Sequence, residues 1–179
     1  MSSPETAKRL RAAVRTIADF PSPGIQFKDI TPILGDRVLL GDAIEALAAP
    51  YLDAGVTKVA GIEARGFILG CALARRLEAG FVPIRKKGKL PYHTHTEAYD
   101  LEYGTDCVEM HVDALGAGDR TLIHDDVIAT GGTALATWRL IQETGAEVVG
   151  FSFLVELGFL SGRGLLTEGR PIHSVLHFE

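Results

Sequence analysis

The chain has 179 residues, of which 46% are hydrophobic and 23% are charged, and this composition is ordinary for one globular domain with a substantial core. Its formal net charge is −5 and its pI is about 5.7, which excludes a general electrostatic attraction to nucleic acid or to an anionic membrane surface. No apolar stretch approaches the length of a membrane-spanning helix. Two isolated cysteines, without metal or redox spacing and without a signal peptide, predict a reduced, cytoplasmic setting.

Strands and helices alternate along the chain. Ser3-Pro4-Glu5 is typical of a helix start, and apolar residues continue at helical spacing as far as Ile17. The alternation of the later elements predicts a parallel α/β sheet in a single domain. These expected elements are, in order, a helix at 36–54, a strand at 56–62, a helix at 66–77, strands at 81–84, 105–112 and 121–124, a helix that starts near 131, and strands at 147–155 and 172–178.

Residues 86–104 do not fit the alternation. The segment is long and polar, it lacks a periodic apolar face, and it contains three lysines. Loops of this length inside compact domains are usually functional lids or disordered segments. We expect a lid loop over an anion site, because its lysines would then meet anionic oxygens.

A motif that suits a phosphorylated sugar follows the strand at 121–124. Asp125 and Asp126 stand where this strand is expected to end, and Ala129-Thr130-Gly131-Gly132-Thr133 then opens the next helix. Free backbone N–H groups and the helix dipole favour an anion at a helix start, and glycines let the backbone approach a phosphate. The threonine hydroxyls add donors, and the two carboxylates can accept hydrogen bonds from ribose hydroxyls. One loop is therefore expected to hold a ribose 5-phosphate at both ends.

A second strand-to-helix turn lies at Gly61–Phe67. Arg65 falls in this turn and Gly66 begins the helix. A guanidinium beside free N–H groups suits a second anion such as pyrophosphate. Ligands of α/β sheets lie outside the carboxyl ends of the strands, so the two turns are expected to face one pocket.

The acidic pair and glycine-rich turn resemble the phosphoribosyl pyrophosphate motif of the type I phosphoribosyltransferases. Further blocks resemble the adenine phosphoribosyltransferase family, and the resemblance runs from about residue 4 to 179: residues 20–34 (FPSPGIQFKDITPIL), 61–77 (GIEARGFILGCALARRL), 85–91 (RKKGKLP) and 99–104 (YDLEYG). The resemblance implies a type I phosphoribosyltransferase fold, in which helices flank a central, mostly parallel sheet. It further implies a small hood from about residues 1–35 and 157–179, a flexible lid at 86–104, and a homodimer.

The same resemblance implies the reaction of adenine with phosphoribosyl pyrophosphate to give AMP and pyrophosphate, with Mg²⁺ as the cofactor. It places the 5-phosphate at Ala129, Thr130, Gly131, Gly132 and Thr133. It implies that Asp125 and Asp126 hold the ribose hydroxyls, and that the substrate carries Mg²⁺ near them, with no direct protein ligand assigned. The remaining implied roles are pyrophosphate binding by Arg65, Arg85, Lys86 and Lys89, adenine binding by Phe27, Lys28 and Leu157, and catalysis by Glu102.

Two alternative functions stay open at this point. One is a different purine or xanthine specificity on the same fold, and the other is a non-catalytic sensor of phosphoribosyl pyrophosphate. Sensors usually add a DNA-binding segment, whereas here a single N-terminal helix and an acidic net charge are found. His93 and His95 lack a nearby third ligand, so a polar loop is favoured over a metal site.

Overall fold

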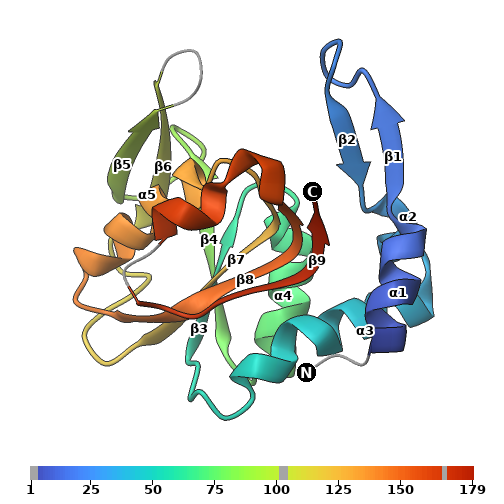
Figure 1. The fold of residues 1–179 in the computed structure, drawn as a ribbon. Helices are drawn as coiled ribbons and strands as arrows, with labels where there is room; N and C mark the ends of the chain where they lie inside the picture. The colour runs from blue at the N-terminus through green and yellow to red at the C-terminus, as the bar shows by residue number, and fades with distance from the viewer. Residues whose placement is uncertain (1–3, 101–104, 167–168) are drawn as a thin grey trace.

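A computed structural model describes residues 4–100, 105–166 and 169–179 of the chain, without the side chain of Asp100. Figure 1 shows the helices and strands along the chain. They are α1 (Pro4–Ala13), β1 (Arg15–Ala18), β2 (Gln26–Asp29), α2 (Thr31–Gly35), α3 (Arg37–Ala48), η1 (Ala49–Tyr51), β3 (Lys58–Ile62), α4 (Gly66–Arg76), β4 (Gly80–Lys86), β5 (Thr94–Asp100), β6 (Thr105–His111), β7 (Arg120–Ile128), α5 (Gly132–Gln142), β8 (Glu147–Leu157), η2 (Gly158–Leu160), η3 (Gly162–Leu166) and β9 (Ile172–Phe178).

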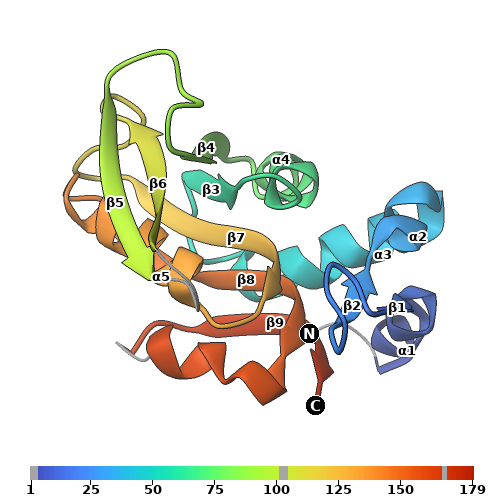
Figure 2. The same ribbon diagram turned by 90° about the horizontal axis from the view of Figure 1, so that it is seen from above.

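The centre of the protein is a seven-stranded sheet in the order β5-β6-β4-β3-β7-β8-β9. Strands β4, β3, β7, β8 and β9 are parallel, and β5 and β6 join antiparallel at one edge. Figure 2 shows α3 and α4 on one side of the sheet and α5 on the other. The expected α/β fold with a mostly parallel sheet is confirmed.

Each face of the sheet carries its own hydrophobic core. Successive side chains of a strand point to opposite faces, so the neighbours Leu122 and Ile123 of β7 belong to different cores. Leu122 packs in the cluster that includes Leu69 of α4, and Ile123 in the one that includes Leu140 of α5. All four side chains have no exposed surface, which explains why the strand reads as a continuous apolar run.

The N-terminal expectation is wrong beyond Ala13. Helix α1 ends there, and Arg15–Ala18 forms a strand that pairs antiparallel with Gln26–Asp29, with Ile17 opposite Phe27. The helical spacing of apolar residues was misleading here, because Thr16 and Ile17 are β-branched and a partner strand lies about ten residues further along the chain. Ser3, the expected cap, lies outside the described residues.

The second expected helix is shorter than predicted. Asp36 caps α3 by accepting hydrogen bonds from the backbone N–H groups of Val38 and Leu39, at 2.8 and 3.0 Å. The α-helix ends at Ala48 and continues as the 3-10 turn Ala49–Tyr51. Pro50 explains this change, because proline has no N–H to donate within a helix.

The expected lid loop is partly regular. Residues 94–100 of the expected lid loop form β5, which pairs with β6 over its whole length, so only the connection before β5 is irregular among the described lid residues. At the other end, the expected strand at 172–178 is present as β9, which pairs parallel with β8 and extends the main sheet. In Figure 1 the β1–β2 and β5–β6 hairpins rise on opposite sides of the upper end of the molecule. Within the described ranges, no helix is long and apolar enough to cross a membrane.

Candidate functional site

The candidate site lies where the connections of the sheet change direction. Strands β3 and β7 are parallel neighbours, but β3 leads through α4 to β4 on one side and β7 leads through α5 to β8 on the other. This is the position at which α/β sheets bind ligands. A cavity of about 440 Å³ lies there, lined by Ile25, Gln26, Phe27, Lys28, Glu63, Ala64, Arg65, Asp125, Asp126, Val127, Ala129 and Leu157. The two turns predicted to face one pocket therefore do so.

The acidic pair lies within β7 and not after it, because this strand continues to Ile128. Pairing with β3 ends at His124, whereas pairing with β8 continues through Asp125 and Val127. One edge of β7 is thus unpaired with β3 beside the acidic pair. Adjacent strand residues point to opposite faces, so the two carboxylates take different positions. Asp125 lines both the large cavity and a second cavity of about 80 Å³ at the glycine-rich loop, and Asp126 lines the large cavity.

Arg65 links the acidic pair to the β1–β2 hairpin. Its Nε lies 2.9 Å from Asp126 Oδ2, and its guanidinium carbon lies 4.9 Å from the centre of the Phe27 ring. The ion pair lacks hydrogen-bond geometry, so Asp126 Oδ2 is a buried oxygen without a hydrogen-bond partner in the part of the chain that is described. The side chain of Arg65 is 40% exposed, which leaves donors of its guanidinium free to meet an anion from the cavity.

Burial dominates the titration of the two carboxyl groups. It raises the pKa of Asp125 well above its usual range, and the neighbouring charge of Asp126 raises it further. Burial also raises the pKa of Asp126, although Arg65 opposes this effect. Two adjacent buried carboxyl groups therefore favour cations and hydroxyl donors as partners.

The glycine-rich loop begins helix α5 with the geometry of an anion site. Gly131 precedes the helix with φ +83°, a left-handed conformation that favours glycine. A Cβ atom added to Gly131 would collide with the carbonyl group of Gly162, so the two backbone segments are in close contact. Residues 127–134 line the smaller cavity together with Asp125 and Phe153. The predicted 5-phosphate residues are thus gathered around one hollow at the positive end of a helix.

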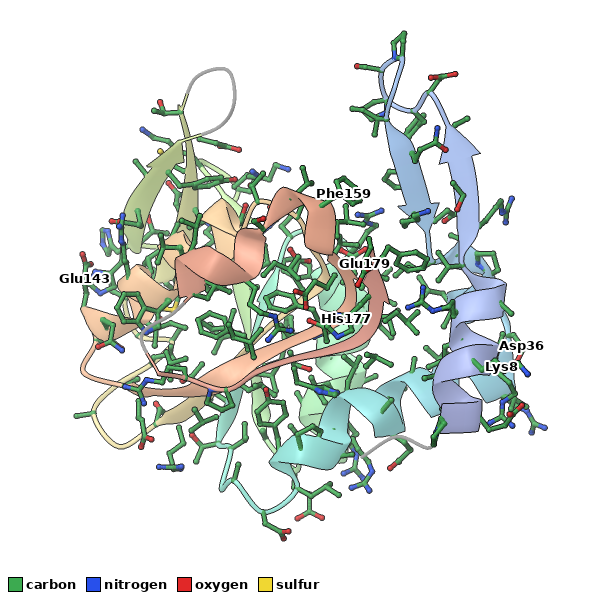
Figure 3. All side chains as sticks on the ribbon, viewed as in Figure 1. Lys8, Asp36, Glu143, Phe159, His177 and Glu179 are labelled. Atoms are coloured by element: carbon green, nitrogen blue, oxygen red, sulfur yellow. The ribbon has the colours of Figure 1, made fainter. Side chains whose placement is uncertain are left out.

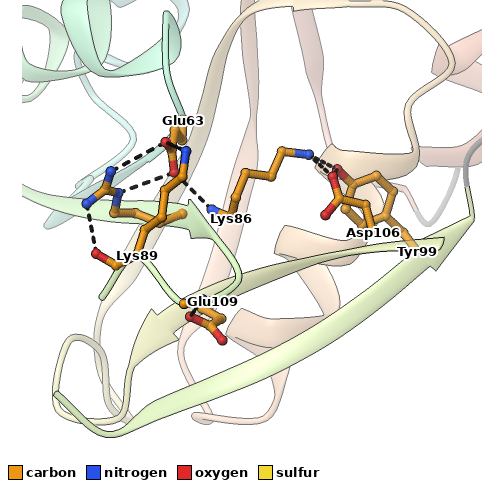
Figure 4. A network of polar contacts seen from close by, with 8 residues as sticks. Glu63, Lys86, Lys89, Tyr99, Asp106 and Glu109 are labelled. Atoms are coloured by element: carbon orange, nitrogen blue, oxygen red, sulfur yellow. Dashed lines mark hydrogen bonds and ion pairs between the residues drawn. The ribbon is translucent and has the colours of Figure 1, made fainter. Parts of the chain in front are cut away.

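Glu63 organises the cations at the base of the lid. As Figure 4 shows, it accepts hydrogen bonds from Arg85 Nε at 3.2 Å, Lys89 Nζ at 2.5 Å and the Lys86 backbone N–H at 2.9 Å. Burial alone would raise the pKa of Glu63, but these hydrogen bonds outweigh burial and lower it to about 2. The side chain of Lys86 instead meets Asp106 and Tyr99. Three of the four cations predicted to bind pyrophosphate, namely Arg85, Lys86 and Lys89, are therefore held by carboxylates in this structure.

The residues predicted to bind adenine all line the large cavity. Phe27 is half-buried and packs edge-on against Phe20, with ring centres 5.1 Å apart. Leu157 reaches the cavity from the end of β8. Lys28 Nζ donates to Thr16 Oγ1 at 2.9 Å, which leaves the backbone of Lys28 as its natural contribution to a base site.

Three residues complete the comparison with the sequence. Glu102, the predicted catalytic residue, lies outside the described residues. Glu63 was missed although it stands inside the block Gly61–Leu77, because nothing local indicates that it holds Arg85 and Lys89. Gly162 was also missed, and no local signal marks it, since its neighbours in the glycine-rich loop are about thirty residues away in the sequence.

Comparisons with known proteins agree with this geometry. A family model described as the phosphoribosyl transferase domain matches residues 34–159. Adenine phosphoribosyltransferase of Myxococcus xanthus is 56% identical over 161 residues, which cover 90% of this chain and 88% of that protein. The crystal structure of adenine phosphoribosyltransferase from Rhodothermus marinus matches with a TM-score of 0.95 and 60% identity, over 98% of this chain and 100% of the other. The Saccharomyces cerevisiae structure, a complex with D-2,5-dideoxy-2,5-imino-altritol 1,6-bisphosphate and adenine, matches with a TM-score of 0.90 and 38% identity, over 96% and 99%.

Proposed function

The chain belongs to the adenine phosphoribosyltransferase family, and on this premise we propose how its residues transfer a phosphoribosyl group to adenine. The reaction of the family takes the 5-phosphoribosyl group from phosphoribosyl pyrophosphate and yields AMP and pyrophosphate, a step of purine salvage. One observation carries the assignment of roles. A single cavity joins the Arg65 turn, the acidic pair and the wall formed by Phe27 and Leu157, and Asp125 connects this cavity to the glycine-rich loop.

The 5-phosphate is assigned to the loop Ala129–Thr133. The orphan N–H groups at the start of α5 and the hydroxyls of Thr130 and Thr133 provide donors, and the helix dipole favours the negative charge. Of the loop residues only Ala129 lines the large cavity, whereas all five line the smaller one, so the loop is assigned to the phosphate and not to the base. It thereby fixes one end of the ribose before the other end reacts.

The ribose is assigned to Asp125 and Asp126. Their carboxylate oxygens accept hydrogen bonds from the ribose hydroxyls, directly or through metal-bound water. Positive charge develops on carbon 1 as pyrophosphate leaves, and buried carboxylates nearby stabilise that charge.

The same oxygens fit a Mg²⁺ ion that arrives with the substrate. Mg²⁺ prefers oxygen ligands and keeps several waters, and Asp126 Oδ2 is a buried oxygen without a hydrogen bond in the described part of the chain. No group of three or more His, Cys, Asp or Glu side chains is clustered for a metal among the described residues, so substrate oxygens would supply most ligands. When bound, the ion neutralises charge on the pyrophosphate that leaves.

Pyrophosphate is assigned to Arg65, with Arg85, Lys86 and Lys89 at the base of the lid. Arg65 lines the large cavity, and Arg85 and Lys89 bind Glu63, which lines it too. The side chain of Lys86 is held by Asp106. Arginine suits this role because its planar fork pairs with two phosphate oxygens at once. On substrate binding, Arg85, Lys86 and Lys89 would exchange the carboxylates that they contact in this structure for the more highly charged pyrophosphate.

Adenine is assigned to the space between Phe27 and Leu157. An aromatic ring on one face and an aliphatic side chain on the other suit a flat base, and backbone groups at Lys28 would read its amino edge. Such a site rejects 6-oxopurines, because a mismatch leaves buried polar groups unpaired. Glu102 is assigned to proton movement on the purine, a kind of catalysis typically worth about 10²–10⁴ in rate.

Two further properties belong to the same proposal. A homodimer is supported by the family and by the apolar side chain of Ile68, 51% exposed on α4 beside the exposed Cys71. A cytoplasmic setting is supported by the two free cysteines. Light scattering of the purified protein tests for the dimer, because the measured molar mass should then be twice that of one chain.

The test of the reaction offers adenine, hypoxanthine, guanine and xanthine separately, with phosphoribosyl pyrophosphate and Mg²⁺. The proposal expects AMP from adenine alone, a loss of activity when the metal is chelated, and a large fall in kcat for Glu102→Ala. The matched control is Arg76→Ala, which removes an ion pair with Glu45 between α3 and α4. Turnover of a 6-oxopurine would refute the base assignment, and tight binding of phosphoribosyl pyrophosphate without turnover of any base would favour the sensor.

A further inference from the structure

The segment that follows β8 packs against the glycine-rich loop. It consists of η2 and η3, and Gly162 lies buried at the start of η3. A Cβ atom added to Gly162 would collide with the Ala129 carbonyl group and with the Gly131 backbone nitrogen. The segment therefore supports the loop by direct backbone contact, which only glycine allows at this position.

The next residue, Arg163, fixes this segment to the sheet. Its Nε donates to Glu156 Oε1 at 2.9 Å and its Nη2 to Glu156 Oε2 at 2.5 Å. Its guanidinium also donates to the Ile172 carbonyl at 2.9 Å and to Ser174 Oγ at 3.3 Å, both on β9. Glu156 is only 7% exposed, and bidentate pairs of this kind are strong and hold one geometry.

The contacts close a ring around the loop. Glu156 of β8 lies opposite Ile128 of β7, the residue directly before the loop. From Ile128 the ring passes along the loop to its contact with Gly162, then through Arg163 and back to Glu156. Figure 3 shows Phe159 on the segment after β8 and His177 near the end of β9. His177 Nδ1 lies 3.3 Å from Glu156 Oε2, so it adds a second contact to the same carboxylate.

We infer that Arg163 is a positioning residue for the phosphate-binding loop, which it holds in place through Gly162 without touching substrate. The inference rests on the proposed assignment of the 5-phosphate to Ala129–Thr133. Because the loop must present its N–H groups in one arrangement, loss of its support weakens binding of phosphoribosyl pyrophosphate. Adenine binding is affected less, because Leu157 remains paired with Phe178 of β9.

The experiment measures kcat and both KM values for Arg163→Ala, Arg163→Lys and wild type. Loss of uniform binding raises KM and leaves kcat nearly unchanged. We expect Arg163→Ala to raise KM for phosphoribosyl pyrophosphate about tenfold, with KM for adenine and kcat within about threefold of wild type. The lysine variant keeps the charge without the fork, and its KM should be intermediate.

Arg76→Ala is the matched control. Arg76 also makes a bidentate pair, with Glu45 at 2.6 and 3.0 Å, and its side chain is 38% exposed against 40% for Arg163. Arg76→Ala should leave both KM values unchanged, and because its partner Glu45 is 61% exposed it should lower the unfolding temperature only slightly. If Arg163→Ala does not fold, Glu156→Gln carries the same comparison, because it keeps the shape and removes the charge of the pair.

The inference is overturned if Arg163→Ala folds and its KM for phosphoribosyl pyrophosphate equals that of wild type. If Arg163→Ala does not fold, the same result for Glu156→Gln overturns it. Thr133→Val separates this failure from failure of the loop assignment, because Thr133 belongs to the loop itself. If Thr133→Val raises KM for phosphoribosyl pyrophosphate and Arg163→Ala does not, only the inference about Arg163 is wrong. If neither variant changes it, the assignment of the 5-phosphate to this loop is wrong as well.

Discussion

His124 lies fully buried in β7, directly before the acidic pair. Its Nδ1 lies 2.9 Å from the Ser152 carbonyl oxygen, so this nitrogen is the donor, and Nε2 has no hydrogen-bond partner among the described residues. Burial lowers the pKa of His124 from 6.5 to about 4, although the hydrogen bond to Ser152 opposes the shift. The imidazole is therefore neutral in the folded protein near pH 7.

The shift makes the protein sensitive to mild acid. Between pH 6.5 and 4 the unfolded chain binds a proton at His124 more readily than the folded chain does. The free energy of unfolding therefore falls as the pH drops through this window. At about 1.4 kcal/mol for each pKa unit, His124 accounts for a loss of about 2 kcal/mol between pH 7 and pH 5. This corresponds to roughly 4–8 °C in the unfolding temperature of a chain of this size.

Thermal unfolding of wild type, His124→Leu and His124→Phe at pH 7, 6 and 5 measures this effect at a fixed protein concentration. The two variants differ in volume and will differ in stability at pH 7, so the informative quantity is the change with pH. Both should lose most of the decline seen in wild type. Burial also lowers the pKa of His173, so His173 accounts for part of the decline in stability that remains in these variants. Variants that retain the full decline of wild type would refute the assignment of this pH sensitivity to His124.

Three further perturbations test the site. Gly131→Ala forces a side chain into a left-handed conformation with φ +83°, so it should lower the free energy of unfolding by about 1–3 kcal/mol and raise KM for phosphoribosyl pyrophosphate. The control is Gly164→Ala, whose added Cβ meets no atom within 4 Å. Thermal unfolding and steady-state kinetics should show no change for this control. Arg65→Lys keeps the charge beside Asp126 but loses the fork, and initial rates should show KM for phosphoribosyl pyrophosphate raised about tenfold; an unchanged KM would contradict the pyrophosphate assignment. The pKa of Glu63 is lowered to about 2, so its stabilising effect is present above pH 4.5 and is lost as the pH falls toward 2. The difference in unfolding temperature between wild type and Glu63→Gln should therefore narrow below pH 4.5, and a constant difference would count against the ionised network.

The local patterns of the chain predicted the larger elements correctly. The helix at 66–77 and the strands at 105–112 and 172–178 agree with α4, β6 and β9 to within a few residues. Periodicity sets such elements, because each buries one face or both faces of a short segment. The prediction failed where strand pairing decided the outcome, as at β1, which begins two residues after the end of α1 and pairs with β2.

The elements of the site were predictable to different degrees. The acidic pair, the glycine-rich turn and Arg65 carry their chemistry in a few adjacent residues, so the sequence indicated both anion sites and their shared pocket. The position of Asp125 and Asp126 inside β7 was not predicted, because the end of a strand depends on its neighbours. Here β8 continues the pairing beyond the point where β3 stops.

The sequence by itself determined the alternation of strands and helices and the residue types of the two turns that line the cavities, because both depend on backbone geometry within a few residues. Only the tertiary structure decided that Glu63 holds Arg85, 22 residues away, and that Gly162 supports Gly131. It likewise decided that the β1–β2 hairpin brings Phe27 to the cavity that Leu157 also lines. These contacts join segments far apart in the chain, and their positions follow from how the layers pack on the sheet, which no local pattern records.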